Sequence, residues 1–91
     1  MSAPIDTERL HRAIYLDVRP VAPGTYLVSG GTDSHTVVID GGLVRCSCID
    51  SQRVGDQCKH ALIARLYCGD PSVVVALRML VARPMRSVRA A

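Results

Sequence analysis

The fold is decided by the stretch from Cys46 to His60, which reads Cys-Ser-Cys-Ile-Asp-Ser-Gln-Arg-Val-Gly-Asp-Gln-Cys-Lys-His. It contains two pairs of metal-binding side chains, Cys46 with Cys48 and Cys58 with His60, separated by nine residues. Zinc prefers four sulfur or nitrogen ligands in a tetrahedral arrangement, and each pair supplies two of them. The spacing therefore predicts one structural zinc ion bound by Cys46, Cys48, Cys58 and His60.

The two pairs need different local structures to reach one ion. Cys46 and Cys48 are two residues apart at the end of an expected strand, so both side chains start from the same face. Cys58 and His60 have the same spacing at an expected helix start, where residues i and i+2 point about 200° apart. We therefore expect Cys58 to precede the first helical turn, where the helix N-terminus favours its thiolate, and His60 to lie inside it.

Other uses of these side chains are disulfide bonds, free thiols and a catalytic zinc ion. The chain's four cysteines allow three disulfide pairings, and a bridge between Cys46 and Cys48 would be strained. A catalytic zinc ion keeps one coordination position open for water, whereas three cysteines and one histidine fill all four positions. The donor set favours a structural ion, and we expect no enzymatic activity.

The composition of the chain suggests that a bound metal ion would contribute to its stability. It has 91 residues, enough for one domain, and a domain of this size is only marginally stable. Aromatic residues make up 3% of the chain, with no Phe and no Trp, so the core depends on smaller side chains. We expect a single domain over residues 1–91, with the zinc unit at about 24–69.

The N-terminus has neither a basic segment nor an apolar one, so no signal peptide is expected. The sequence also lacks an apolar run long enough for a transmembrane helix. We therefore expect a cytoplasmic protein that does not associate with membranes. In a reducing compartment cysteines more often bind metal than form structural disulfides.

Hydrophobic periodicity and turn signals predict an α+β fold. The expected elements are an amphipathic helix over 5–17 capped by Asp6, a proline-stiffened connector over 18–24, a three-stranded antiparallel meander over 25–29, 34–40 and 43–46 with a turn at Gly41-Gly42, a polar loop over 49–57, and a zinc-knuckle helix over 59–67 with Leu62, Ile63 and Leu66 in the core.

Gly69 is a suitable stop for the zinc-knuckle helix, and Asp70 followed by Pro71 is a suitable start for another. That last helix, over 73–82, is apolar on nearly all sides, so it either closes the core or contacts a partner, including a second copy. We expect Pro84 to end it and residues 84–91 to form a flexible basic tail.

The motif resembles the SWIM zinc finger family, whose signature is Cys-x-Cys, a variable spacer and Cys-x-His. Here the signature reads Cys46-Ser47-Cys48 and Cys58-Lys59-His60-Ala61-Leu62. The expected strands at 25–28 and 36–39 and the helix at 9–16 are similarly placed, so the likeness spans residues 9–67. The resemblance implies a small β-β-α zinc unit that binds DNA or proteins. Members of the family are often attached to larger catalytic proteins, whose activities we do not expect of this chain.

Three other residues have chemistry that the motif does not use. We expect Cys68 to be a small apolar filler at a helix end, although a redox-sensitive thiol or an exchanging ligand stays open. His11 and His35 are expected to be solvated on a helix surface and in a strand, with a metal or second-shell role as the alternative.

Charge suggests two classes of partner. The formal net charge is +3, and three lost thiol protons with one Zn²⁺ leave about +2. Four cations surround the motif, and they could contact phosphates or be ordinary solvated charges: Arg45, Arg53, Lys59 and Arg65. We expect a zinc-stabilised adaptor that binds a protein partner through its C-terminal helix or sheet edge. A homodimer formed through residues 73–82 is also consistent with this interpretation of the last helix. The alternative is a DNA-binding accessory protein with sequence-independent phosphate contacts, acting in transcription, recombination or transposition.

Overall fold

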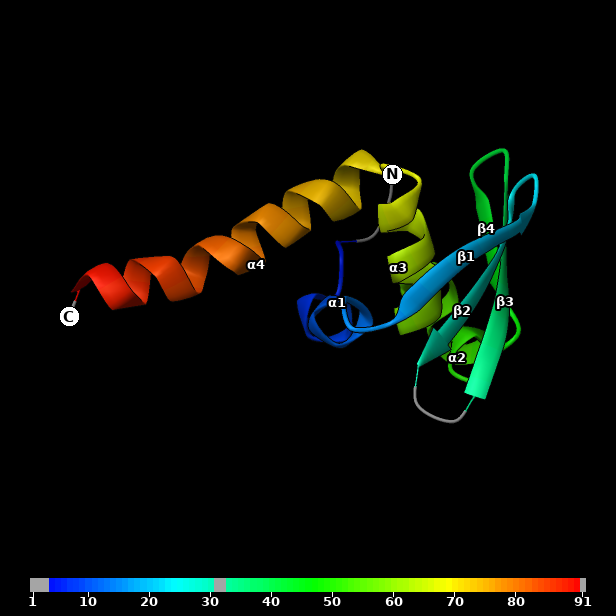
Figure 1. The fold of residues 1–91 in the computed structure, drawn as a ribbon, viewed down its shortest axis with the longest axis horizontal. Coiled ribbons are helices and arrows are strands. Elements are labelled where there is room, and N and C mark those ends of the chain that lie inside the picture. The colour runs from blue at the N-terminus through cyan, green and yellow to red at the C-terminus, as the bar shows by residue number, and fades with distance from the viewer. Residues whose placement is uncertain (1–3, 31–32, 91) are drawn as a thin grey trace.

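A computed structural model describes residues 4–30 and 33–90, with side chains as far as Ala82. In chain order its elements are α1 (Thr7–Ala13), β1 (Asp17–Ala22), β2 (Thr25–Gly30), β3 (Asp33–Asp40), β4 (Leu43–Cys46), α2 (Ser51–Val54), the 3-10 turn η1 (Gly55–Gln57), α3 (Lys59–Tyr67) and α4 (Pro71–Ala90). The predicted α+β class is confirmed. In Figure 1 the strands form one layer, and α3 lies against it.

The sheet has four antiparallel strands in the order β1-β2-β3-β4, not the three that we expected. The additional strand, β1, occupies the segment predicted to be a connector. Pro20 cannot donate a backbone hydrogen bond, but β1 lies at the sheet edge, where a proline is tolerated. The pairing with β2 is irregular between Pro20 and Ala22, which is typical of a β-bulge.

Two tight connections set the register of the strands. Gly41 and Gly42 join β3 to β4 with φ angles of 54° and 91°, which confirms the predicted hairpin turn. Gly24 has φ 74°, its carbonyl accepts a 2.7 Å hydrogen bond from the Ile39 N–H, and an added Cβ would lie 2.7 Å from the Ile39 oxygen. A glycine is therefore needed at position 24.

The hydrophobic core lies between the inner face of the sheet and the helices α1, α3 and α4. Its members are buried aliphatic side chains from each of these elements: Leu10, Ala13, Val28, Val37, Leu62, Ile63, Ala64 and Val73. Leu66 packs against this cluster while remaining partly exposed. The bounds of α3 and its predicted core contacts are thus confirmed.

The N-terminal helix is shorter than predicted, because α1 ends at Ala13 and the chain enters β1 at Asp17. Its cap is as expected: the Asp6 carboxylate accepts hydrogen bonds from the N–H groups of Glu8 and Arg9. Gln57 holds the segment before α1 from across the fold. Its side-chain amide accepts from the Asp6 N–H at 3.0 Å and donates to the Pro4 carbonyl at 2.9 Å.

The spacer between the two ligand pairs is folded, whereas we expected a polar loop. It contains α2 and η1, and the N–H groups of Arg53 and Val54 both donate to the Asp50 carbonyl at 3.0 Å. Such a single turn is stabilised by local hydrogen bonds and by ligands fixed at both ends, so hydrophobic periodicity gives no sign of it.

Gly69 ends α3 with a φ of 80°, and Asp70 caps α4 by accepting a 3.0 Å hydrogen bond from the Ser72 N–H, as predicted. The prediction that Pro84 ends α4 is wrong, because the helix continues to Ala90. A proline removes one helical hydrogen bond, and the neighbouring Ala82, Arg83, Met85 and Arg86 all favour helix. The side chains beyond Ala82 lie outside the described part of the chain, so the flexibility of residues 84–91 stays a prediction.

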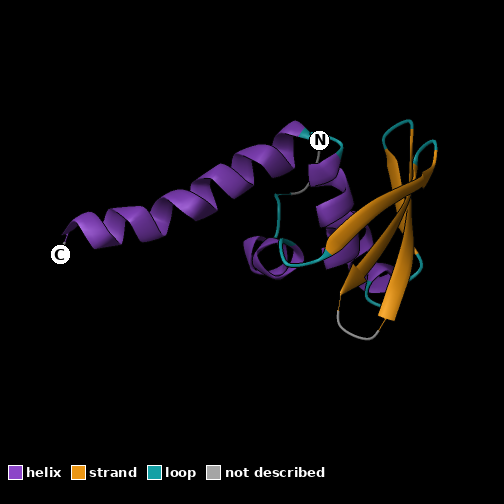
Figure 2. Cartoon of the chain, in the orientation of Figure 1, coloured by secondary structure: helices purple, strands orange, loops and turns teal. Residues whose placement is uncertain are grey.

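Only the first part of α4 closes the core. Val73 is fully buried, Ala76 and Leu77 pack against the core while partly exposed, and the helix then extends away from the body (Figures 1 and 2). Met79 is 64% exposed and Val75 is 53% exposed. Among the described residues, no helix has the length and hydropathy needed to span a membrane.

Candidate metal centre

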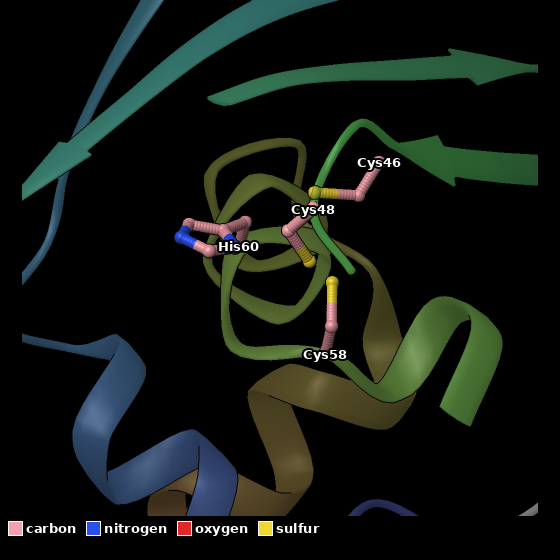
Figure 3. Close-up of side chains that lie close together, drawn as sticks. All are labelled: Cys46, Cys48, Cys58 and His60. Carbon is pink, nitrogen blue, oxygen red and sulfur yellow. The ribbon is translucent and has the colours of Figure 1, made fainter. Parts of the chain in front are cut away.

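The four predicted ligands come together in the structure. Cys46, Cys48, Cys58 and His60 each offer a ligand atom, and these atoms all lie within 4.8 Å of one another. Figure 3 shows the three sulfurs converging beside the imidazole ring. Cys48, Cys58 and His60 are buried and Cys46 is partly exposed, so the cluster lies beneath the surface rather than on it.

The end of β4 and the start of α3 supply the ligands. Cys46 is the last residue of β4, and Cys48 follows after the chain has left the strand. Cys58 is the N-cap of α3, and its sulfur accepts a 3.3 Å hydrogen bond from the Ala61 N–H. His60 lies within the first turn of α3. The predicted placement of both ligands on this helix is therefore confirmed.

Without a bound cation, the thiols of Cys46 and Cys58 have pKa values shifted in opposite directions. A hydrogen bond between Cys46 and Cys58 lowers the pKa of Cys46 and, together with burial, raises the pKa of Cys58. Three thiols this close cannot all ionise without a compensating cation, because neighbouring thiolates repel one another. A divalent metal ion removes this conflict, and the donor set of three sulfurs and one nitrogen is one that zinc prefers.

His60 is also suited to bind a metal ion. Burial lowers its pKa to about 4, with further contributions from the charges of His35 and Lys59, so the ring is neutral at physiological pH. Its Nδ1 is buried and is the one buried side-chain nitrogen or oxygen without a hydrogen-bond partner in the described part of the chain. A buried nitrogen without a partner costs free energy unless it binds something, and a metal ion supplies that partner.

The sequence did not predict that His35 lies beside the metal centre. We expected it to be solvated, but it is partly buried, and its ring centroid lies 4.4 Å from that of His60. It points inward because it pairs with the buried Val28, and directly opposite residues share a face of an antiparallel sheet. This register is the signal that could have located it. His11 is exposed on α1, where its ring contacts Tyr15.

The four candidate cations do not form one patch. Arg65 is buried, donates 2.9 Å and 3.0 Å hydrogen bonds to the Asp70 carboxylate and the Asp56 carbonyl, and is therefore not free to contact a phosphate. Arg45 is exposed and pairs with Val38 on the sheet face opposite the core, whereas Lys59 is exposed at the start of α3. Arg53 is exposed on α2.

Cys68 was expected to be an apolar filler, and that prediction is wrong. It caps the C-terminus of α3, is exposed, and its thiol donates a 3.1 Å hydrogen bond to the Tyr26 hydroxyl. Cys68 lies outside the group of four metal-binding side chains.

This fold and site define a small zinc-binding module in which the ion joins a β-hairpin to the start of a helix. The model of the SWIM zinc finger family matches residues 26–69, which include all four ligands. This part of the chain is a SWIM zinc finger, and its cofactor is one structural Zn²⁺. Comparisons with curated proteins and with solved structures gave no match.

Proposed function

We propose that this zinc finger is a scaffold that presents α4 to another protein. The observation that carries the proposal is the exposed apolar face of α4. Val75, Met79 and Ala82 recur at helical spacing and are exposed, and they lie on the side of the helix opposite the buried Val73.

The exposed face of α4 would gain stability from a bound partner. An isolated helix is marginally stable in water, and most helices gain stability from tertiary packing of an apolar face. Met79, Val81 and Ala82 are exposed beyond Leu77, so a partner that covers Val75 and Met79 would stabilise this part of α4. Recognition of an amphipathic helix in an apolar groove is a recurring mode of protein binding.

The positive charge of α4 favours binding to a different protein over binding to a second copy of this chain. Residues 71–91 contain four arginines and no acidic residue. Two such helices side by side in parallel would place like charges together, whereas a groove with an acidic rim would complement them. We therefore favour a partner of this kind over the homodimer through residues 73–82.

The zinc ion has a structural role in this proposal. Four protein ligands fill a tetrahedral site and leave no position for a substrate or an activated water, so we propose binding without catalysis. Because its thiolates must stay reduced, we also propose that the protein acts in the cytoplasm.

The experiment is capture of partners from a native lysate by the zinc-loaded protein. We expect Val75→Glu/Met79→Glu to lose the partner, because it places two charges on the binding face. The matched control is Leu43→Glu, which puts a charge on another apolar side chain, 63% exposed, at the β3–β4 hairpin. Equal capture by both variants would contradict the proposal, and a change of mass in size-exclusion chromatography without lysate would instead indicate a homodimer.

DNA binding is the second candidate, and one cationic hollow supports it. Arg9, Arg12, Lys59 and Asp50 line this hollow, although the Arg9 guanidinium already lies 3.2 Å from the Asp50 carboxylate. Arg12 and Lys59 are the exposed cations available there. Such binding would be insensitive to sequence and would weaken steeply with salt. A fluorescence titration at two salt concentrations, with Arg12→Gln/Lys59→Gln as the variant, tests it. Unchanged affinity in the variant would exclude this hollow.

A further inference from the structure

Two serine hydroxyls hold the turn that carries Cys46 and Cys48. Ser47 lies between these ligands, and Ser51 opens α2 directly after them. Neither side chain is a metal ligand. Their hydrogen bonds nevertheless fix the backbone on both sides of the two sulfurs.

Ser47 completes the pairing with β3 at the point where the chain leaves the sheet. Its N–H donates to the Thr36 carbonyl at 3.1 Å, as the next residue of a regular antiparallel strand would do. The return hydrogen bond is different, because the Thr36 N–H donates to the Ser47 hydroxyl at 3.1 Å. The hydroxyl thus takes the place of a strand carbonyl, and the Ser47 backbone is free to turn.

Ser51 holds the other side of the turn. Its hydroxyl lies 2.8 Å from the Cys46 carbonyl oxygen and 2.7 Å from the Cys48 carbonyl oxygen, and its one proton is shared between them. These carbonyls belong to the two ligands of the first pair. One side chain therefore fixes the relative orientation of the two residues whose sulfurs must meet at one ion.

We propose that Ser47 and Ser51 are positioning residues that preorganise Cys46 and Cys48 for zinc. Without these hydroxyls, the backbone from Cys46 to Cys48 would continue as a strand. The turn that brings both sulfurs to one point would then lack the hydrogen bonds that hold it. Groups that orient metal ligands without touching the metal contribute to affinity in many proteins. This inference concerns the metal centre and does not depend on the proposed function of α4.

His35 extends the same network to the fourth ligand. Its Nδ1 lies 3.3 Å from the Ser47 hydroxyl, and its ring packs beside that of His60. The Ser47 oxygen accepts from the Thr36 N–H and also lies within hydrogen-bond distance of the His35 ring. Ser47 thus links the Cys-x-Cys turn to the ring that lies against His60.

The experiment measures zinc affinity by competition with a chromophoric chelator and records the absorption spectrum of the cobalt-loaded protein. We expect Ser47→Ala and Ser51→Ala each to weaken zinc binding by about 10- to 100-fold, as is typical for such groups. The ligand-field bands of Co²⁺ should shift because the sulfur positions change, a result that general loss of stability would not produce. Ser47→Thr retains the hydroxyl and should restore both affinity and spectrum.

The matched control is Ser72→Ala, which removes the same atom from an exposed serine at the start of α4. The Ser72 hydroxyl makes no hydrogen bond in the described part of the chain, so this variant should behave as wild type. Wild-type affinity and an unchanged cobalt spectrum in Ser47→Ala and Ser51→Ala would overturn the proposal. Because we expect the domain to unfold without metal, a loss of fold stability alone also lowers zinc affinity, so the cobalt spectrum at saturating metal decides the question. A weaker affinity with an unchanged spectrum would also overturn the proposal.

Discussion

The guanidinium of Arg65 lies 2.9 Å from the carboxylate of Asp70, across the turn that joins α3 to α4. Arg65 is buried, and Asp70 also caps α4 through the Ser72 N–H. Burial raises the pKa of Asp70, but the hydrogen bond and charge of Arg65 outweigh that effect and hold the pKa below its usual value. This pair therefore connects the zinc finger to the helix that we propose as its binding element.

The first prediction concerns this pair. Arg65→Met removes the hydrogen bonds to Asp70 and the Asp56 carbonyl, and we expect the free energy of unfolding to fall by about 1.5–3 kcal/mol, because the Asp70 carboxylate that is left without a partner is partly exposed. Urea unfolding of the zinc-loaded protein measures this. Arg53→Met, at an exposed position on α2, is the control and should change stability little. Equal effects of the two substitutions would show that the ion pair does not stabilise the fold.

The second prediction concerns removal of zinc. A chelator should unfold the domain, because the binding free energy of a structural zinc ion, on the order of 10 kcal/mol, also stabilises the fold. Circular dichroism before and after complete removal tests this, and added zinc should restore the spectrum. Cys58→Ser should behave like the chelated protein, whereas Cys68→Ser should bind zinc normally. An unchanged melting curve after complete removal would show that the ion is dispensable.

The third prediction concerns pH and proton release. Zinc binding at neutral pH should release protons from the thiols, including the proton of Cys58, whose pKa is raised by its hydrogen bond to Cys46 and by burial. His60 should release none, because its pKa is about 4. Protons released on binding mean that affinity rises with pH and falls on acidification. Calorimetry in buffers of different ionisation enthalpy counts these protons, and an added imidazole proton near pH 6 would contradict the assignment for His60.

The fourth prediction distinguishes the two faces of α4. Leu77 packs against the core, so Leu77→Ala should lower the free energy of unfolding by about 1–2 kcal/mol, in proportion to its partial burial. Met79 is 64% exposed, and Met79→Ala should leave stability nearly unchanged. Thermal unfolding of both variants compares the faces. A larger loss from Met79→Ala would mean that α4 is rotated relative to this description.

The metal centre was the most predictable part of the molecule. Its donor types and spacing are set by the chemistry of zinc, so Cys46, Cys48, Cys58 and His60 could be named from the chain alone. The bounds of α3 followed from local signals, namely the ligand pair at its start and Gly69 at its end. Both features depend on residues close in sequence.

The features that were missed depend on contacts between distant residues. β1 was read as a connector because Pro20 and Pro23 disfavour strands, and only its place at the sheet edge makes Pro20 acceptable. The place of His35 depends on the register between β2 and β3. Arg65 looked like a surface cation because charged residues usually are exposed, and its burial follows from pairing with Asp56 and Asp70.

The spacer between Cys48 and Cys58 has both ends fixed at the same ion, which has a practical consequence for labelling the protein. The spacer is folded, and the Asp56 carbonyl accepts a 3.0 Å hydrogen bond from the buried Arg65, so an insertion between Gly55 and Asp56 would disturb η1. Arg53 is exposed on α2. A fluorescent reporter attached at position 53 would leave the four ligands in place, and it would sense unfolding of the spacer when the metal is lost.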